Sequence, residues 1–135
     1  MSLLFTYLSV AATFVALDMI WLRTMVERLY RPVLGDMLRS EPDLAAAAVF
    51  YLAYPVGLIW FAVLPAQQDG GALRAFMSGV MLGCFTYATY DLTNQATLKN
   101  WPVAVTIADI CWGTVLTAIA ATAGFLVSSA FSRPA

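Results

Sequence analysis

The chain has 135 residues, of which 61% are apolar, seven basic and eight acidic, for a formal net charge of −1. An average soluble domain has about 25% charged residues, more than twice the 11% found here. So few charges cannot cover the surface of a soluble monomer, and the apolar composition excludes a disordered chain. The slightly negative net charge argues against a nucleic-acid partner. The composition therefore predicts a membrane protein, with one domain over residues 1–135.

Four apolar stretches each have the roughly 20 residues that a helix needs to cross a bilayer. They lie at residues 3–22, 44–64, 73–92 and 103–127. Only four charged residues fall inside these stretches, and their continuous apolar runs differ from the alternating pattern of a barrel strand. The first stretch lacks the basic start of a signal peptide. We predict an all-α, polytopic membrane protein whose four transmembrane helices form a bundle.

Residues 23–43, directly after the first stretch, hold eight charged residues, with apolar residues at near-helical spacing between the arginines. Pro32 and Gly35 are expected to divide the segment into two pieces. We predict an amphipathic interfacial segment that lies in the headgroup layer. Its arginines either bind anionic lipid or only anchor the chain before it re-enters the bilayer.

Basic residues are unequally divided between the two sides of such a protein. The connections after the first and third helices hold five of them: Arg23, Arg28, Arg31, Arg39 and Lys99. The opposite side holds only Arg74 and Arg133. Because cytoplasmic loops are enriched in basic residues, we expect the two connections in the cytoplasm and both termini on the other side of the membrane.

Three aspartates inside the predicted helices approach the cytoplasmic face. At 1.5 Å per residue, Asp18 lies on the order of 6 Å from that face and Asp109 roughly 9 Å, while Asp91 lies at the end of its helix. The elements Asp18-Met-Ile-Trp21 and Asp109-Ile-Cys-Trp112 would also meet there, because the first and last helices run antiparallel. An ionisable group inside a membrane is expensive and commonly functional.

A polar, aromatic-lined pocket is predicted where these residues converge, and the second stretch adds Tyr51 and Tyr54. A stripe of small residues after Asp109 is expected to direct that side chain toward the other helices. Two of the carboxyl groups could share a proton. The candidate ligand-binding residues are Asp18, Trp21, Tyr87, Tyr90, Asp91, Asn94, Lys99, Asp109 and Trp112.

The alternative interpretation gives each aspartate a purely structural partner. Asp18 would pair with Arg23 or the indole of Trp101, and Asp91 with Lys99 or a helix cap. The helix that holds Asp109 contains no basic residue, so its partner must come from elsewhere in the chain. The possible partners are Lys99, Arg23, a tyrosine hydroxyl or a bound cation.

Histidine is absent from the chain, and its two cysteines, Cys84 and Cys111, lack the spacing of metal ligands. These facts argue against His-ligated haem, most zinc sites and any histidine-activated nucleophile. The sequence also lacks a phosphate-binding loop and a dinucleotide fingerprint. We therefore expect no metal site and can assign no cofactor. Carboxylates, tyrosines and Lys99 would carry any chemistry.

Several segments have a pattern that extends over nearly the whole chain. They are Asp18-Met-Ile-Trp21-Leu22, the run GCFTYATYDLTNQAT from Gly83 to Thr97, Trp101-Pro102, and Asp109-Ile-Cys-Trp112-Gly113. Together they resemble a family of small bacterial inner-membrane proteins, domain of unknown function 2177, and Tyr90 to Asn94 is the most specific part. The resemblance implies a four-helix protein of the bacterial inner (cytoplasmic) membrane without an established activity. Both termini would then be periplasmic.

Three kinds of function fit these features. The first is binding or transport of a small cationic or polar-headed, lipid-like ligand, since carboxylates attract a cation and aromatic faces hold it. A transport path would call for a homodimer or a larger membrane complex. The second is a membrane enzyme that acts on lipid headgroups, with aspartates as acid and base or as Mg²⁺ ligands. The third is an accessory subunit in which polar residues only hold helices together.

The orientation can be tested directly with Ser2→Cys and Ser132→Cys variants. Because the basic residues favour cytoplasmic connections, a membrane-impermeant maleimide should label the cysteine introduced in each variant in intact cells. Labelling that occurs only after the membrane is opened would reverse the orientation.

Overall fold

The computed structural model describes residues 2–132, and this part of the chain is helical with no strand. The all-α prediction is therefore confirmed. The elements are α1 (Ser2–Met25), the π-helical η1 (Val26–Tyr30), α2 (Arg31–Leu34), the 3₁₀-helical η2 (Gly35–Met37), α3 (Leu44–Leu58), the π-helical η3 (Ile59–Val63), α4 (Leu64–Gln68), α5 (Gly71–Thr97) and α6 (Val103–Ser132).

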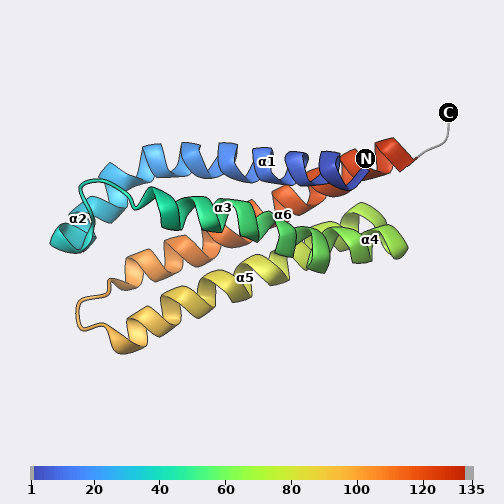
Figure 1. Ribbon diagram of the computed structural model, residues 1–135. Coiled ribbons are helices and arrows are strands. Elements are labelled where there is room, and N and C mark those ends of the chain that lie inside the picture. The colour runs from blue at the N-terminus through green and yellow to red at the C-terminus, as the bar shows by residue number, and fades with distance from the viewer. Residues whose placement is uncertain (1, 133–135) are drawn as a thin grey trace.

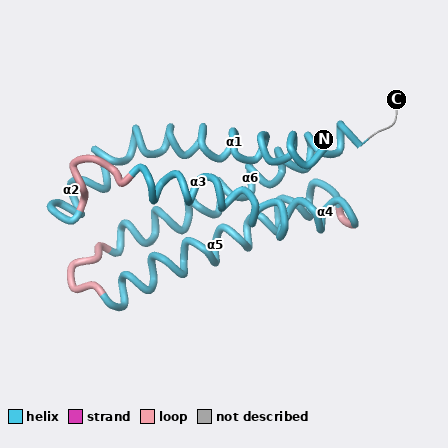
Figure 2. The backbone as a smooth tube through the Cα atoms, in the orientation of Figure 1, coloured by secondary structure: helices cyan, strands magenta, loops and turns pink. Residues whose placement is uncertain are grey.

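The long helices run alternately in opposite directions along one axis (Figure 1). Residues 38–43 and 98–102 lie at one end, which we call the connection end, and Figure 2 shows them as loops on the left. The turn between α4 and α5 lies at the opposite, terminal end, where α1 begins and α6 ends. The rings of Phe5 and Phe131 stack there with 4.8 Å between their centroids.

Three helical stretches within residues 2–132 are long and apolar enough to cross a membrane. They are Leu3–Met37, Leu44–Gln68 and Val103–Ser132. The fourth predicted crossing, at 73–92, lies within α5, which has 27 residues but a more polar second half. The protein is thus a membrane protein with several apolar helices, and the length and direction of α5 are consistent with four crossings.

The first helical stretch is longer than the predicted span at 3–22. α1 continues to Met25, and η1, α2 and η2 follow without a loop, because the apolar residues after position 22 keep their helical spacing. Pro32 falls in the first turn of α2, where proline is tolerated. Gly35 ends α2 with φ of 53°, a value that favours glycine. The position of 23–43 in the headgroup layer stays a prediction.

Glycines bring α5 and α6 into close contact. A Cβ atom on Gly79 would lie 2.7 Å from the Cα atom of Ala118, and one on Gly83 would lie 2.4 Å from the carbonyl oxygen of Gly113. Small residues permit this kind of approach between membrane helices. The stripe of small residues that follows Asp109 in α6 is buried, and it consists of Gly113, Thr117, Ala120 and Gly124.

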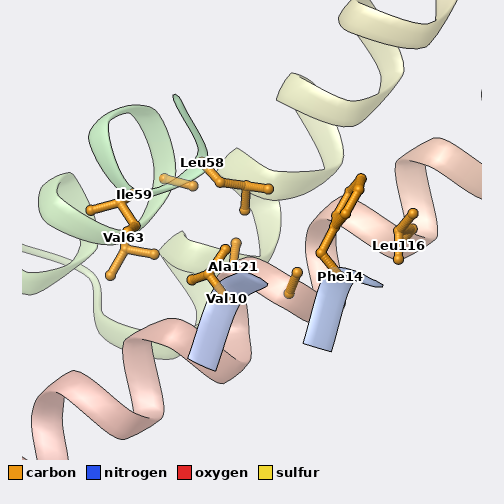
Figure 3. Packing of buried hydrophobic residues seen from close by; sticks show 9 residues of the cluster. Val10, Phe14, Leu58, Ile59, Val63, Leu116 and Ala121 are labelled. Carbon is orange, nitrogen blue, oxygen red and sulfur yellow. The ribbon is translucent and has the colours of Figure 1, made fainter. Parts of the chain in front are cut away.

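An apolar core joins α1, α3, η3 and α6 on the terminal side of Asp18. Figure 3 shows Val10 and Phe14 of α1 gathered with Leu58, Val63 and Leu116 in this core. Because this part of the molecule is filled by apolar side chains, the buried carboxyl groups are confined to the connection end. Arg133, which was counted in the predicted orientation, lies outside the described residues.

The close contact at Gly83 predicts that Gly83→Ala destabilises the protein. The added methyl group would push α5 away from α6, at a cost of about 1–3 kcal/mol in the free energy of unfolding. Denaturant unfolding in detergent micelles measures this cost. Gly57→Ala is the matched control, because a Cβ at Gly57 meets nothing within 4 Å. Equal stability of the two variants would contradict the proposed packing.

Candidate functional site

Asp18 is held at the connection end by donors from two other helices. Its side chain is on α1 and is 8% exposed. The indole Nε1 of Trp112 on α6 donates to Oδ1 at 3.0 Å, and the hydroxyl of Tyr51 on α3 donates to Oδ2. The indole of Trp101 donates instead to Thr106 at 3.0 Å. Asp18 thus connects three helices through neutral donors.

The partner of Asp109 is a tyrosine hydroxyl, one of the four possibilities that the sequence left open. The hydroxyl of Tyr30 on η1 donates to Asp109 Oδ1. The same hydroxyl accepts a hydrogen bond of 3.0 Å from the indole Nε1 of Trp21. Tyr30 therefore links Trp21 of the first helix to Asp109 of the last.

The two Asp-x-x-Trp elements meet as their antiparallel helices predicted. The indole rings of Trp21 and Trp112 stack with centroids 4.6 Å apart and planes 5° apart. Trp112 bonds directly to Asp18, and Trp21 reaches Asp109 through Tyr30. We call these five residues the Asp–Trp cluster. Each carboxyl group thus accepts a hydrogen bond from the helical stretch that holds the other.

The local backbone explains how Tyr30 reaches this cluster. Nine residues along a regular α-helix would place Tyr30 on the side opposite Trp21. The π-helical turn of η1, from Val26 to Tyr30, has i→i+5 hydrogen bonds and changes that rotation. Tyr30 was not among the candidate residues predicted from the sequence. No motif in the sequence marks it, because its position depends on this single irregular turn.

An open pocket of about 460 Å³ lies beside the Asp–Trp cluster. Two carboxyl groups and eight aromatic rings line it. The lining residues are Asp18, Trp21, Leu22, Tyr30, Phe50, Tyr51, Tyr54, Thr86, Tyr87, Tyr90, Asp109 and Trp112. Six of the nine candidate residues from the sequence are among them, as are the tyrosines expected from the second stretch.

The side chain of Tyr87 enters the pocket because Gly113 leaves room for its ring. A Cβ atom on Gly113 would lie 2.2 Å from the ring of Tyr87. Tyr54 is fixed by two hydrogen bonds that join its hydroxyl to the hydroxyls of Thr86, at 2.9 Å, and Thr117, at 3.0 Å. These contacts join α3, α5 and α6 at the base of the pocket.

Three candidate residues do not line the pocket. Asp91 is completely buried in α5, Asn94 is half-buried near the end of that helix, and Lys99 is exposed in the following connection. Asn94 and Lys99 follow the part of α5 that lines the pocket, so they lie beyond its edge. Phe50 and Thr86 line it although sequence reasoning passed over them, because an apolar or small hydroxyl side chain gives no distinctive signal.

These features occur in a chain whose sequence matches a known family over residues 3–126. The chain belongs to the family "Predicted membrane protein (DUF2177)". The resemblance seen in the sequence is thereby confirmed, and the match covers every residue of the pocket. No curated protein and no solved structure matches the chain.

Asp91 of this DUF2177 protein has no donor for either carboxyl oxygen. Its carboxyl group instead lies within hydrogen-bonding range of the carboxyl of Asp109. Two ionised carboxylates offer acceptors only, so this contact becomes a hydrogen bond when one of them carries a proton.

Basic side chains do not compensate the three buried or half-buried aspartates. The ion pairs among residues 2–132 join Arg31 to Glu27, Arg39 to Asp43 and Arg74 to Asp69. None of them includes Asp18, Asp91 or Asp109, and the structural pairing of Asp91 with Lys99 is absent. In the same part of the chain, no group of three or more potential metal-ligating side chains forms.

The bridging role of Tyr30 can be tested with Tyr30→Phe. Loss of the hydroxyl leaves Asp109 and the Trp21 indole without their shared partner, which should lower the free energy of unfolding by about 1–3 kcal/mol. Tyr90→Phe is the control, because Tyr90 is 59% exposed and contacts Trp101 through its ring. Thermal unfolding in micelles that is equal for both variants would contradict the role of Tyr30.

Proposed function

We propose that this DUF2177 protein binds a small cationic, lipid-like molecule in the pocket at the connection end. The observation that carries the proposal is the combination of two carboxyl groups with eight aromatic rings, with no ion pair to a basic residue in the described chain. Carboxylates attract an ammonium group, and aromatic faces hold it by cation–π interaction. Asp18 and Asp109 would supply the negative charge.

The size and position of the pocket support an amphipathic ligand. Its volume of about 460 Å³ lies within the range of roughly 300–1,000 Å³ for small-molecule sites. Phe50 and Tyr90 line it while 40% and 59% exposed, respectively. The rim therefore reaches the outer surface of the helices, where an alkyl chain would remain in contact with lipid while the charged group lies near the carboxylates.

The distribution of basic residues gives this site an orientation. Arg23, Arg28, Arg31, Arg39 and Lys99 lie toward the connection end, so the pocket would open toward the cytoplasmic leaflet of a bacterial inner membrane. Transport of the ligand, in place of binding alone, would require a second copy or a larger complex, because one copy provides too few helices to surround a path.

The two alternative functions make different demands on the same residues. An enzyme that uses two aspartates as acid and base needs both at the substrate. Asp18 and Asp109 meet this condition because both line the pocket, whereas Asp91 does not. An accessory subunit needs the carboxyl groups only as hydrogen-bond acceptors between helices. The accessory function therefore predicts that loss of the Asp109 charge matters for stability and leaves ligand retention unchanged.

Asp109→Asn separates binding from structure. The asparagine keeps a side-chain oxygen that accepts from Tyr30, so stability should be unchanged or raised as a buried charge is removed. Binding of decyltrimethylammonium, followed by tryptophan fluorescence in micelles, should weaken at least about tenfold, or about 1.4 kcal/mol. Native mass spectrometry should show loss of any co-purified cation.

Two controls make this experiment specific. Decyl sulfate has the same alkyl chain with the opposite charge and should not bind to the wild-type protein. Asp36→Asn removes an exposed carboxylate from the connection end and should bind the ammonium probe like the wild type. Lowered stability of Asp109→Asn together with unchanged binding would support the accessory function and reject the ligand site.

A further inference from the structure

Among the described carboxyl groups near the Asp–Trp cluster, Asp91 alone is fully buried and accepts no hydrogen bond. Its side chain is 0% exposed, and both of its oxygens lack a hydrogen-bond partner that could donate. The group it faces is the carboxyl of Asp109. Two like charges in contact inside a region of low dielectric repel strongly, so the pair is unfavourable when both are ionised.

The groups packed around this pair do not supply a positive charge. Asp18 approaches from α1, Tyr30 from η1 and Tyr87 from α5, and each is either acidic or a neutral hydroxyl. Tyr51 of α3 donates to Asp18 on the same side of the pocket. No basic side chain is therefore at hand to compensate the charge of Asp91 in the described surroundings. A proton is small enough to do so without any change in packing.

The positions of the two aspartates differ in a way that suits different roles. Asp109 lines the pocket, where a ligand can reach it, whereas Asp91 lies behind it and does not line the pocket. A positive charge that binds beside Asp109 would stabilise both carboxylates in their ionised form. The proton between them would then no longer be needed to relieve their repulsion.

We propose that Asp91 and Asp109 hold one proton between them at neutral pH, and that this proton leaves when an organic cation binds in the pocket. The O–H bond of the protonated carboxyl breaks, the proton passes to water through the open pocket, and both carboxyl groups become ionised. One positive charge enters as one leaves, so the net charge of the site is constant. The exchange rests on the cation site proposed above, whereas the shared proton does not.

Calorimetry of decyltrimethylammonium binding tests the exchange. Titrations in two buffers with different ionisation enthalpies, at the same pH, should show about one proton released per cation bound to the wild type. The affinity should then rise about tenfold per pH unit in the range where release is complete. Release near zero in the wild type, with the cation bound, would overturn the exchange and leave the cation site standing.

Asp91→Asn identifies the residue that stores the proton. The amide can donate a hydrogen bond to Asp109 but has no proton to release, so proton release should fall to zero and the affinity should lose its dependence on pH. Asp36→Asn should keep the wild-type proton release. Full release from Asp91→Asn would overturn the assignment, and if this variant does not fold, the wild-type titrations in two buffers decide the proposal.

Infrared spectroscopy tests the shared proton when no cation is present. A protonated buried carboxyl should give a C=O stretching band at neutral pH that shifts in D₂O and is absent from Asp91→Asn. If the wild type binds no decyltrimethylammonium, the proposed function fails, and this band still decides whether the proton is held. The lack of the band in the wild type would overturn the shared proton itself.

Discussion

The hydrogen bonds required by buried carboxyl groups determine how the connection end is built. Buried polar groups are nearly always hydrogen-bonded, and Asp18 and Asp109 take their donors from other segments of the chain. Trp112 and Tyr51 donate to Asp18, and Tyr30 donates to Asp109. Because each donor comes from a different segment, these two side chains connect the first, second and last helices at the connection end.

Packing elsewhere in the molecule leaves this end free for a pocket. Toward the terminal end, apolar residues of α1, η3 and α6 fill the interior, and glycines of α5 allow close contact with α6. At the connection end, eight aromatic rings line the open pocket. Asp91 differs from the other two aspartates at this end, because neither of its carboxyl oxygens accepts a hydrogen bond from a donor.

Local features of the sequence were sufficient for the helical class, the long apolar stretches and the shared location of the three aspartates. Hydrophobicity and helical rise depend only on neighbouring residues, so these properties can be predicted without knowledge of the fold. The meeting of the two Asp-x-x-Trp elements followed from the antiparallel direction of the first and last helices. Six of the nine candidate residues line the pocket, and their role in binding stays a prediction.

Only the tertiary structure decided which groups contact each carboxyl group. The π-helical turn of η1 brings Tyr30 to Asp109, and the rotation of α5 places Asp91 behind Asp109 instead of in the pocket. Lys99, expected at the site, is exposed. These outcomes depend on how helices rotate and pack against one another, which residue spacing does not specify. The sequence by itself thus determined the helical class and the end of the molecule where the acids gather, and packing determined their partners.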